Sequence, residues 1–107
     1  MTIIEIKNDK MLCKINPGLG ARCTGLVWRG GDVHILREPP AADDVSVLYG
    51  IPVLFPVNRI SGACFDFDGL TYSFPVNEPE TGCFLHGELN SYPFETVYSG
   101  ENRAAFL

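Results

Sequence analysis

The sequence has 107 residues, of which 46% are hydrophobic and 20% are charged, and this balance is typical of a folded globular domain rather than a disordered chain. Thirteen acidic residues against eight basic residues give a net charge of −5. No cluster of lysine or arginine is available to follow a phosphate backbone, which argues against nucleic acid as a partner.

The chain also lacks the features of an exported or membrane-spanning protein. Its first ten residues, MTIIEIKNDK, alternate apolar with polar side chains and have neither the basic nor the continuous apolar region of a signal peptide. The longest apolar stretch, residues 45–57, contains Gly50, Pro52 and Pro56 and is too short to span a bilayer. We therefore expect a cytoplasmic protein with no membrane partner.

Cysteine usage agrees with that expectation. The four cysteines are widely separated, and they form neither a CxxC pair nor a group with nearby histidines that would build a zinc site: Cys13, Cys23, Cys64 and Cys83. We expect four reduced thiols that pack as small apolar residues, with no bound metal.

The first third of the chain predicts a meander of antiparallel strands, because apolar residues recur with a period of two and no window shows helical spacing. Strands are expected at residues 2–7, 11–15, 21–29 and 33–36, separated by turn residues such as Asn8-Asp9 and Gly30-Gly31-Asp32. Residues 37–56 contain four prolines, each of which removes a backbone donor, so this stretch is expected to be a structured connection. The predicted fold class is all-β.

A β-hairpin is predicted around Asp68-Gly69, since these two residues suit the positive φ angles of a type I′ turn. With that turn, Phe67 faces Leu70 and Phe65 faces Tyr72, which places the apolar side chains on one face of the hairpin. After a loop at residues 77–82, further strands are expected at 83–87, 93–99 and 103–107.

The last predicted strand runs to Leu107 without a polar tail or a terminating turn. We therefore expect residues 1–107 to be part of one domain whose remainder is absent. Such a domain part would have open sheet edges through which the chain can self-associate.

A few residues could carry chemistry. Arg59, beside Asn58, can offer a planar fork of donors to ligand oxygens, although a surface or salt-bridged arginine is the more common case. His86 precedes Gly87, whose missing side chain would let a ligand approach the ring, but a structural histidine is again the more common case. His34 is expected on an exposed strand face. The remaining candidates are three glutamates expected in solvated loops: Glu78, Glu80 and Glu88.

The order of motifs is more specific than any of them alone. Three stretches carry it: GARCTGLVWRGGDVHIL, GIPVLFPVNRISGACFDFDGLTYSFPVNE and FLHGELNSYPFETV. In this order they resemble the N-terminal part of the aldose 1-epimerase family, the mutarotases. The matching positions are Gly20-Ala21, the run from Gly50 to Pro56, Asn58-Arg59, Gly69 with Tyr72, and His86-Gly87.

The resemblance implies the antiparallel β-sandwich of a galactose mutarotase-like supersandwich and an isomerase that interconverts the α and β anomers of a free hexose by acid/base ring opening. It implies a monosaccharide substrate, no cofactor, and substrate-binding roles for Arg59, His86 and Asn58. In the family the general acid is a second histidine and the general base is a glutamate, both from later in the chain, so both are expected beyond Leu107.

Two alternatives stay open. The chain could be a non-catalytic relative that binds a carbohydrate or recognises a sugar phosphate. It could also be a half-domain that functions only when another copy or another polypeptide completes it.

Overall fold

The computed structural model describes residues 2–41 and 43–107, and almost all of its regular structure is β-strand. The chain divides into two compact units. One comprises Met1–Val53 and Leu89–Leu107, and the other comprises Leu54–Glu88. We describe each unit by itself.

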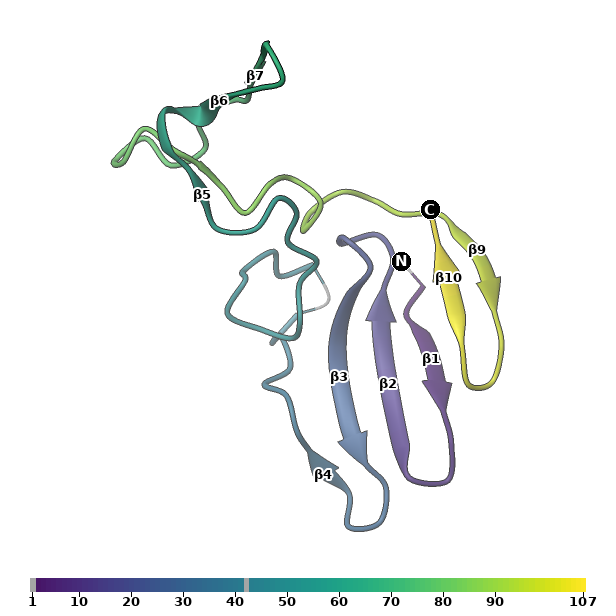
Figure 1. The fold of residues 1–107 in the computed structure, drawn as a ribbon. Coiled ribbons are helices and arrows are strands. Elements are labelled where there is room, and N and C mark those ends of the chain that lie inside the picture. Colours follow the sequence, from purple (N-terminus) through teal and green to yellow (C-terminus); the bar gives the residue numbers. More distant parts are fainter. Residues whose placement is uncertain (1, 42) are drawn as a thin grey trace. The chain divides into compact units, whose positions relative to one another are not determined.

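The first unit contains a four-stranded antiparallel sheet in the order β1-β2-β3-β4 (Figure 1). Its strands are β1 (Ile4–Lys7), β2 (Met11–Asn16), β3 (Arg22–Trp28) and β4 (Val33–His34). The turn from β1 to β2 is closed by Asn8, whose Oδ1 accepts hydrogen bonds from the backbone N–H groups of Lys10 and Met11 at 2.9 and 2.7 Å. The predicted meander is therefore confirmed.

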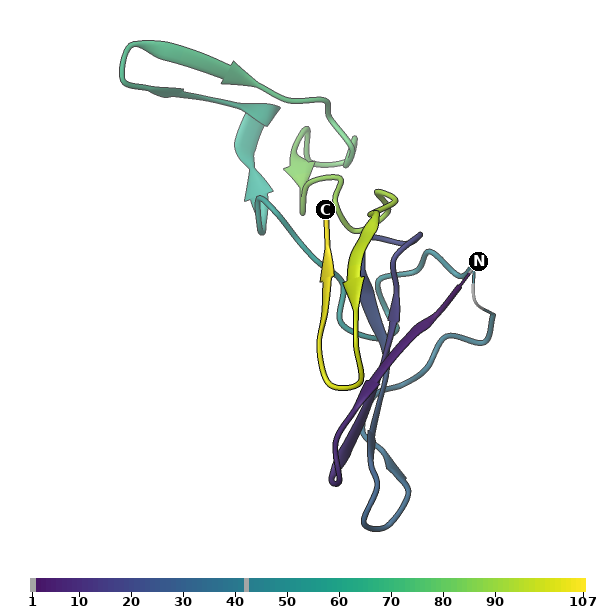
Figure 2. The ribbon, with the colours of Figure 1, turned by 90° about the vertical axis from the view of Figure 1, so that its right-hand side faces the viewer.

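A second hairpin of this unit is formed by β9 (Thr96–Ser99) and β10 (Ala104–Phe106). Its turn reaches the end of β1, where the N–H of Lys7 donates to the carbonyl of Glu101 at 2.7 Å (Figures 1 and 2). This bond connects the end of the sheet to a segment that lies far from it in the sequence.

A buried arginine organises the interior of this unit. Arg22, the first residue of β3, is only 1% exposed, and its Nη1 donates to the carbonyl of Ser46 at 2.6 Å. Its Nη2 lies 3.4 Å from the carbonyl of Val45 and 3.3 Å from that of Asn90. Burial lowers the pKa of the guanidinium, and the nearby carboxylate of Asp44 opposes that effect. One side chain thus satisfies carbonyl groups on two irregular segments.

The second unit contains the predicted hairpin, formed by β6 (Cys64–Phe67) and β7 (Leu70–Ser73). The observed register pairs Phe67 with Leu70 and Phe65 with Tyr72, as predicted. Asp68 and Gly69 have φ angles of 49° and 76°, which are the left-handed values that this turn requires. The sequence therefore predicted both the turn and the register.

Two very short strands, β5 (Arg59–Ile60) and β8 (Phe84–Leu85), pair antiparallel in the same unit. A 3₁₀ turn, Ser61–Ala63, joins β5 to the hairpin. The rings of Phe74 and Phe84 meet edge to face at a centroid distance of 5.0 Å, and Phe84 is only 4% exposed. The core of this unit therefore lies where the hairpin base meets β8.

The cysteines are free thiols. Cys13 and Cys23 lie on neighbouring strands with their sulfur atoms 3.4 Å apart. Burial, together with the contact to Cys23, raises the pKa of the Cys13 thiol to about 12, so Cys13 stays protonated at neutral pH. Cys83 is buried as expected, whereas Cys64 is exposed on the hairpin.

Candidate functional site

The backbone of β5 and β8 brings the three predicted site residues together. Asn58 precedes β5 and His86 follows β8, so the antiparallel pairing of the two strands places them opposite one another. The N–H of His86 donates to the carbonyl of Asn58 at 2.9 Å, and the N–H of Asn58 donates to Nδ1 of His86 at 3.2 Å. Both residues have positive φ, 63° for Asn58 and 60° for His86. Asparagine and histidine are among the side chains that enter this region most readily.

The bond from Asn58 determines the chemical form in which the imidazole is presented. A ring nitrogen that accepts a hydrogen bond carries no proton, so the neutral ring of His86 is protonated on Nε2. The ring is partly exposed. It therefore offers an N–H donor to a ligand, while hydrogen bonds to the backbone of Asn58 hold both the His86 main chain and the other ring nitrogen.

Gly87 lies directly against another backbone segment. A Cβ atom at this position would lie 1.8 Å from the carbonyl oxygen of Phe55, which forms a bridge with Gly87, and the φ angle of Gly87 is +69°. Glycine is needed here because another backbone segment fills the space that a side chain would occupy. The backbone at Gly87 thus packs directly against the backbone of Phe55.

Arg59 makes a two-point ion pair with Glu78, which lies in the loop between β7 and β8. Arg59 Nε lies 2.6 Å from Glu78 Oε1, and Arg59 Nη2 lies 3.0 Å from Glu78 Oε2. The Arg59 side chain is 51% exposed and the Glu78 side chain is 17% exposed. The hydrogen bond from Arg59 is the main reason that the pKa of Glu78 falls to about 2, and a hydrogen bond from Thr81 lowers it further. The same ion pair raises the pKa of Arg59.

The sequence pattern does not indicate this partner, because it places Glu78, Glu80 and Glu88 alike in solvated loops. Glu80 and Glu88 are exposed, but Glu78 is largely covered. The one local signal is the neighbouring Asn77, whose side chain donates to the carbonyl of Leu85 at 2.9 Å and accepts from its N–H at 2.6 Å. The Asn77 side chain joins the start of the loop to β8. Because β8 pairs with β5, this attachment places Glu78 close to Arg59.

His34, the other histidine of the chain, has carboxylate neighbours in the first unit. Its Nδ1 lies 3.0 Å from Glu38 Oε1, and its Nε2 lies 3.7 Å from Asp32 Oδ1. It lies on the exposed strand β4, as predicted. These contacts engage both ring nitrogens of an exposed side chain in the first unit, whereas Arg59 and His86 belong to the second, so His34 is not a candidate for the site.

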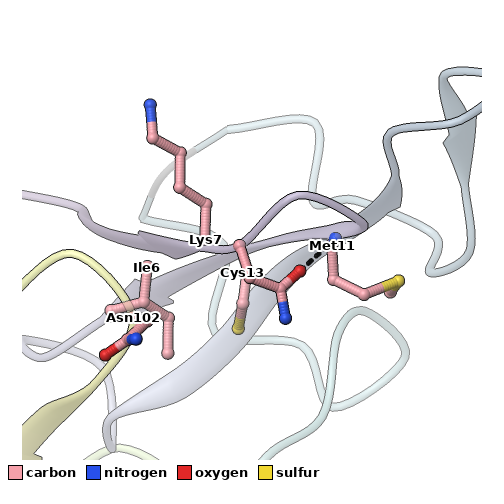
Figure 3. A pocket seen from close by; sticks show the side chains of 6 residues that line it. Ile6, Lys7, Met11, Cys13 and Asn102 are labelled. Carbon is pink, nitrogen blue, oxygen red and sulfur yellow. Dashed lines mark hydrogen bonds between the residues drawn. The ribbon is translucent and has the colours of Figure 1, made fainter.

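A pocket elsewhere in the first unit is small. It has a volume of about 120 Å³ and is lined by six residues at the β1–β2 and β9–β10 turns (Figure 3): Ile6, Lys7, Asn8, Met11, Cys13 and Asn102. Small-molecule sites usually measure roughly 300 Å³ or more. The pocket is therefore too small for a sugar and marks the junction of two turns.

A model of one protein family, described as aldose 1-epimerase, matches residues 2–107. The chain belongs to the aldose 1-epimerase family. Membership agrees with the resemblance that the ordered motifs predicted.

Three solved structures are similar to this aldose 1-epimerase family member. A galactose mutarotase-like protein from Clostridium acetobutylicum is 27% identical, with 95% of this chain and 32% of that chain covered and a TM-score of 0.80. A GalM/aldose epimerase homologue from C. elegans is 23% identical, with 98% and 34% covered and a TM-score of 0.81. A putative aldose 1-epimerase from Escherichia coli K12 is 21% identical, with 98% and 35% covered and a TM-score of 0.80.

These comparisons bear on the fold and on the extent of the chain. The predicted fold class, an antiparallel β-sandwich of the galactose mutarotase-like type, is confirmed. The chain spans about a third of the length of the solved structures that it matches. In the described part of the chain, no helix has the length and apolar character needed to cross a bilayer.

Proposed function

We propose that this chain supplies the sugar-contacting part of an isomerase that interconverts the α and β anomers of a free hexose. The observation that carries the proposal is the meeting of Asn58, Arg59 and His86 at the ends of two paired strands. There, a guanidinium and an imidazole N–H both remain available as donors. Hydroxyl groups and a ring oxygen are the acceptors that such donors suit.

In the proposed reaction, an acid protonates the ring oxygen while a base removes the proton of the anomeric hydroxyl. The ring opens to the aldehyde, the C1 group rotates, and closure gives either anomer. Arg59 and His86 would hold and polarise the sugar, and Asn58 would fix the His86 ring. No cofactor takes part in these proton transfers.

We further propose that residues 1–107 form part of one mutarotase-like domain. The general acid, a histidine, and the general base, a glutamate, would come from chain outside these residues. Support comes from the share of the relatives' length that this chain spans, 32–35%. The chain itself has two histidines, and His34 is paired with Glu38.

The charges of the second unit favour an uncharged sugar over a sugar phosphate. Residues 54–88 contain one arginine, no lysine and five acidic residues: Asp66, Asp68, Glu78, Glu80 and Glu88. Arg59 is already neutralised by Glu78. Phosphate recognition usually relies on uncompensated cationic donors, and this unit offers none besides the half-exposed edge of Arg59.

Polarimetry tests the proposal. The full-length product of the gene that encodes these residues should accelerate the mutarotation of a free hexose, and Arg59→Ala or His86→Ala should each lower kcat/KM by roughly 100-fold, the typical cost of a lost polarising donor. His34→Ala is the matched control, because it removes the histidine that pairs with Glu38. Full activity in both site variants would rule out these roles.

A second candidate role is completion by another polypeptide or another copy. One observation favours it: apolar side chains on one face of the β6–β7 hairpin are open, with Phe67 68% and Leu70 60% exposed. Calorimetric titration of the 107-residue chain with free hexoses separates the roles. Binding without turnover would favour a carbohydrate-binding module, and binding only after association would favour an assembled half.

A further inference from the structure

We propose that Glu78 is a positioning residue for the sugar site: it holds the guanidinium of Arg59 in one orientation, so that the remaining edge of the guanidinium faces a ligand. This inference rests on the proposed function and deepens it, because it adds a residue that sequence reasoning had assigned to a solvated loop. Glu78 itself makes no contact with the sugar in this scheme.

The donors of Arg59 show how the orientation is set. A guanidinium has five N–H donors in a rigid plane. Glu78 takes one from Nε and one from Nη2, through two separate oxygens, which leaves both donors of Nη1 and one of Nη2. A two-point contact fixes the plane as well as the position of the group. Two of the free donors, one on Nη1 and one on Nη2, therefore lie side by side on one edge of a fixed plane.

Glu78 is itself anchored by its own loop. The carbonyl of Glu78 accepts from the N–H of Gly82 at 3.0 Å and from that of Cys83 at 3.3 Å, and the N–H of Glu78 donates to the carbonyl of Cys83 at 3.2 Å. On the side chain, Thr81 Oγ1 donates to the Oε1 atom that also accepts from Arg59. The carboxylate is thus held by backbone and side chain before any ligand arrives.

An arginine held in this way loses less conformational entropy when it binds a ligand. A free, long side chain must give up rotamer freedom when it contacts a ligand, and ordering it beforehand removes that cost. The pairing also compensates the positive charge, so the free edge donates hydrogen bonds without attracting anions strongly. Both effects suit a neutral polyhydroxy ligand, and both depend on the carboxylate of Glu78.

The test compares Glu78→Gln with Glu80→Gln in the full-length product of the gene, using polarimetry with a free hexose and inorganic phosphate as an inhibitor. The two substitutions remove the same charge from the same loop, but Glu80 is exposed and lies two residues away. Glu78→Gln should raise KM by about 2- to 10-fold, the range expected when one long side chain loses its preorganisation. It should also make phosphate a competitive inhibitor, because Arg59 gains an uncompensated charge.

Glu80→Gln should leave KM and phosphate sensitivity at the wild-type values, and Glu78→Asp should restore phosphate resistance because it restores the negative charge. A general loss of folding would not create phosphate sensitivity, and the Asp variant covers the case in which Glu78→Gln fails to fold. An active wild type in which Glu78→Gln behaves like Glu80→Gln would overturn the positioning role alone. An inactive wild type would overturn the proposed function and this role with it.

Discussion

Three charged residues that are easily taken for surface groups have defined partners in this protein. Arg59 and Glu78 form a two-point ion pair, and Arg22 is buried against three carbonyl groups. The ion pair between Arg59 and Glu78 is partly exposed, so solvent screens the attraction between its charges. Arg22 cannot be replaced by an apolar residue without leaving the buried carbonyl acceptors unpaired.

The low pKa of Glu78 predicts a pH dependence with a definite sign. Its pKa in the folded protein is about 2, below the value of about 4.3 expected for an unfolded chain. Its contribution to stability is therefore present above about pH 4 and is lost as the pH falls toward 2. Urea unfolding of wild type and Glu78→Gln across this range should show the difference in unfolding free energy shrinking with falling pH. A gap between wild type and Glu78→Gln that stays constant from pH 6 to 2 would contradict the ion pair.

Arg22 predicts a large loss of stability on substitution. Arg22→Met keeps an unbranched stem but removes the guanidinium, which leaves the carbonyls of Ser46, Val45 and Asn90 without their donor, so we expect a loss of about 3 kcal/mol in the free energy of unfolding. Lys10→Met, at an exposed turn position, is the control and should change stability by less than about 0.5 kcal/mol. Chemical denaturation monitored by tryptophan fluorescence measures both. Similar losses in the two variants would argue against the buried network.

Turns and strand ends, rather than long strands, determine the geometry of the second unit. Its strands β5 and β8 have two residues each, and the hairpin β6–β7 is held by its Asp68-Gly69 turn. Two glycines with similar φ angles, Gly69 at +76° and Gly87 at +69°, have very different surroundings. A substitution at Gly69 therefore measures the strain of a left-handed backbone alone, whereas one at Gly87 adds a steric clash.

Alanine at the two glycines should therefore give unequal results. No atom lies within 4 Å of a Cβ built on Gly69, so Gly69→Ala should cost only the strain of its φ angle, about 1 kcal/mol. A Cβ on Gly87 would lie 1.8 Å from the Phe55 carbonyl oxygen, so Gly87→Ala must displace the backbone beside His86. Thermal unfolding measures the first effect. NMR chemical shifts of the His86 ring should change in the Gly87 variant and remain unchanged in the Gly69 variant.

The exposed apolar face of the β6–β7 hairpin has consequences for the behaviour of the protein in solution. Phe65, Phe67, Leu70 and Tyr72 are between 40% and 68% exposed on one face of the β6–β7 hairpin. Exposed apolar faces of this kind favour association. The cost of leaving them in water falls when another surface covers them.

We therefore predict that the 107-residue chain self-associates through this face. Sedimentation velocity should show a concentration-dependent shift for the wild type, and Phe67→Lys should reduce that shift because it places a charge at the centre of the face. Val97→Lys adds the same charge at another exposed apolar position, 56% exposed on β9, and should leave the shift unchanged. A wild type that stays monomeric at every concentration would contradict the prediction.

The sequence predicted those parts of the structure that depend on neighbours along the chain. The Asp68-Gly69 hairpin was correct in turn and register, because turn chemistry and alternation are local signals. The motif order around Arg59 and His86 correctly gave the family. Glu78 was missed because its partner lies 19 residues away and is reached only through the loop that Asn77 fastens to β8. Arg22 was missed because charged residues are ordinarily exposed, and no local pattern marks a buried one.

The reciprocal hydrogen bonds between Asn58 and His86 have a consequence for hydrogen exchange. The amide of His86 is held by the Asn58 carbonyl, whereas the amide of Asn58 is held by the His86 ring. Separation of β5 from β8 exposes both amides to solvent, but rotation of the ring alone exposes only that of Asn58. The difference between the two exchange rates therefore reports, without any ligand, how often the imidazole leaves the orientation in which it can bind one.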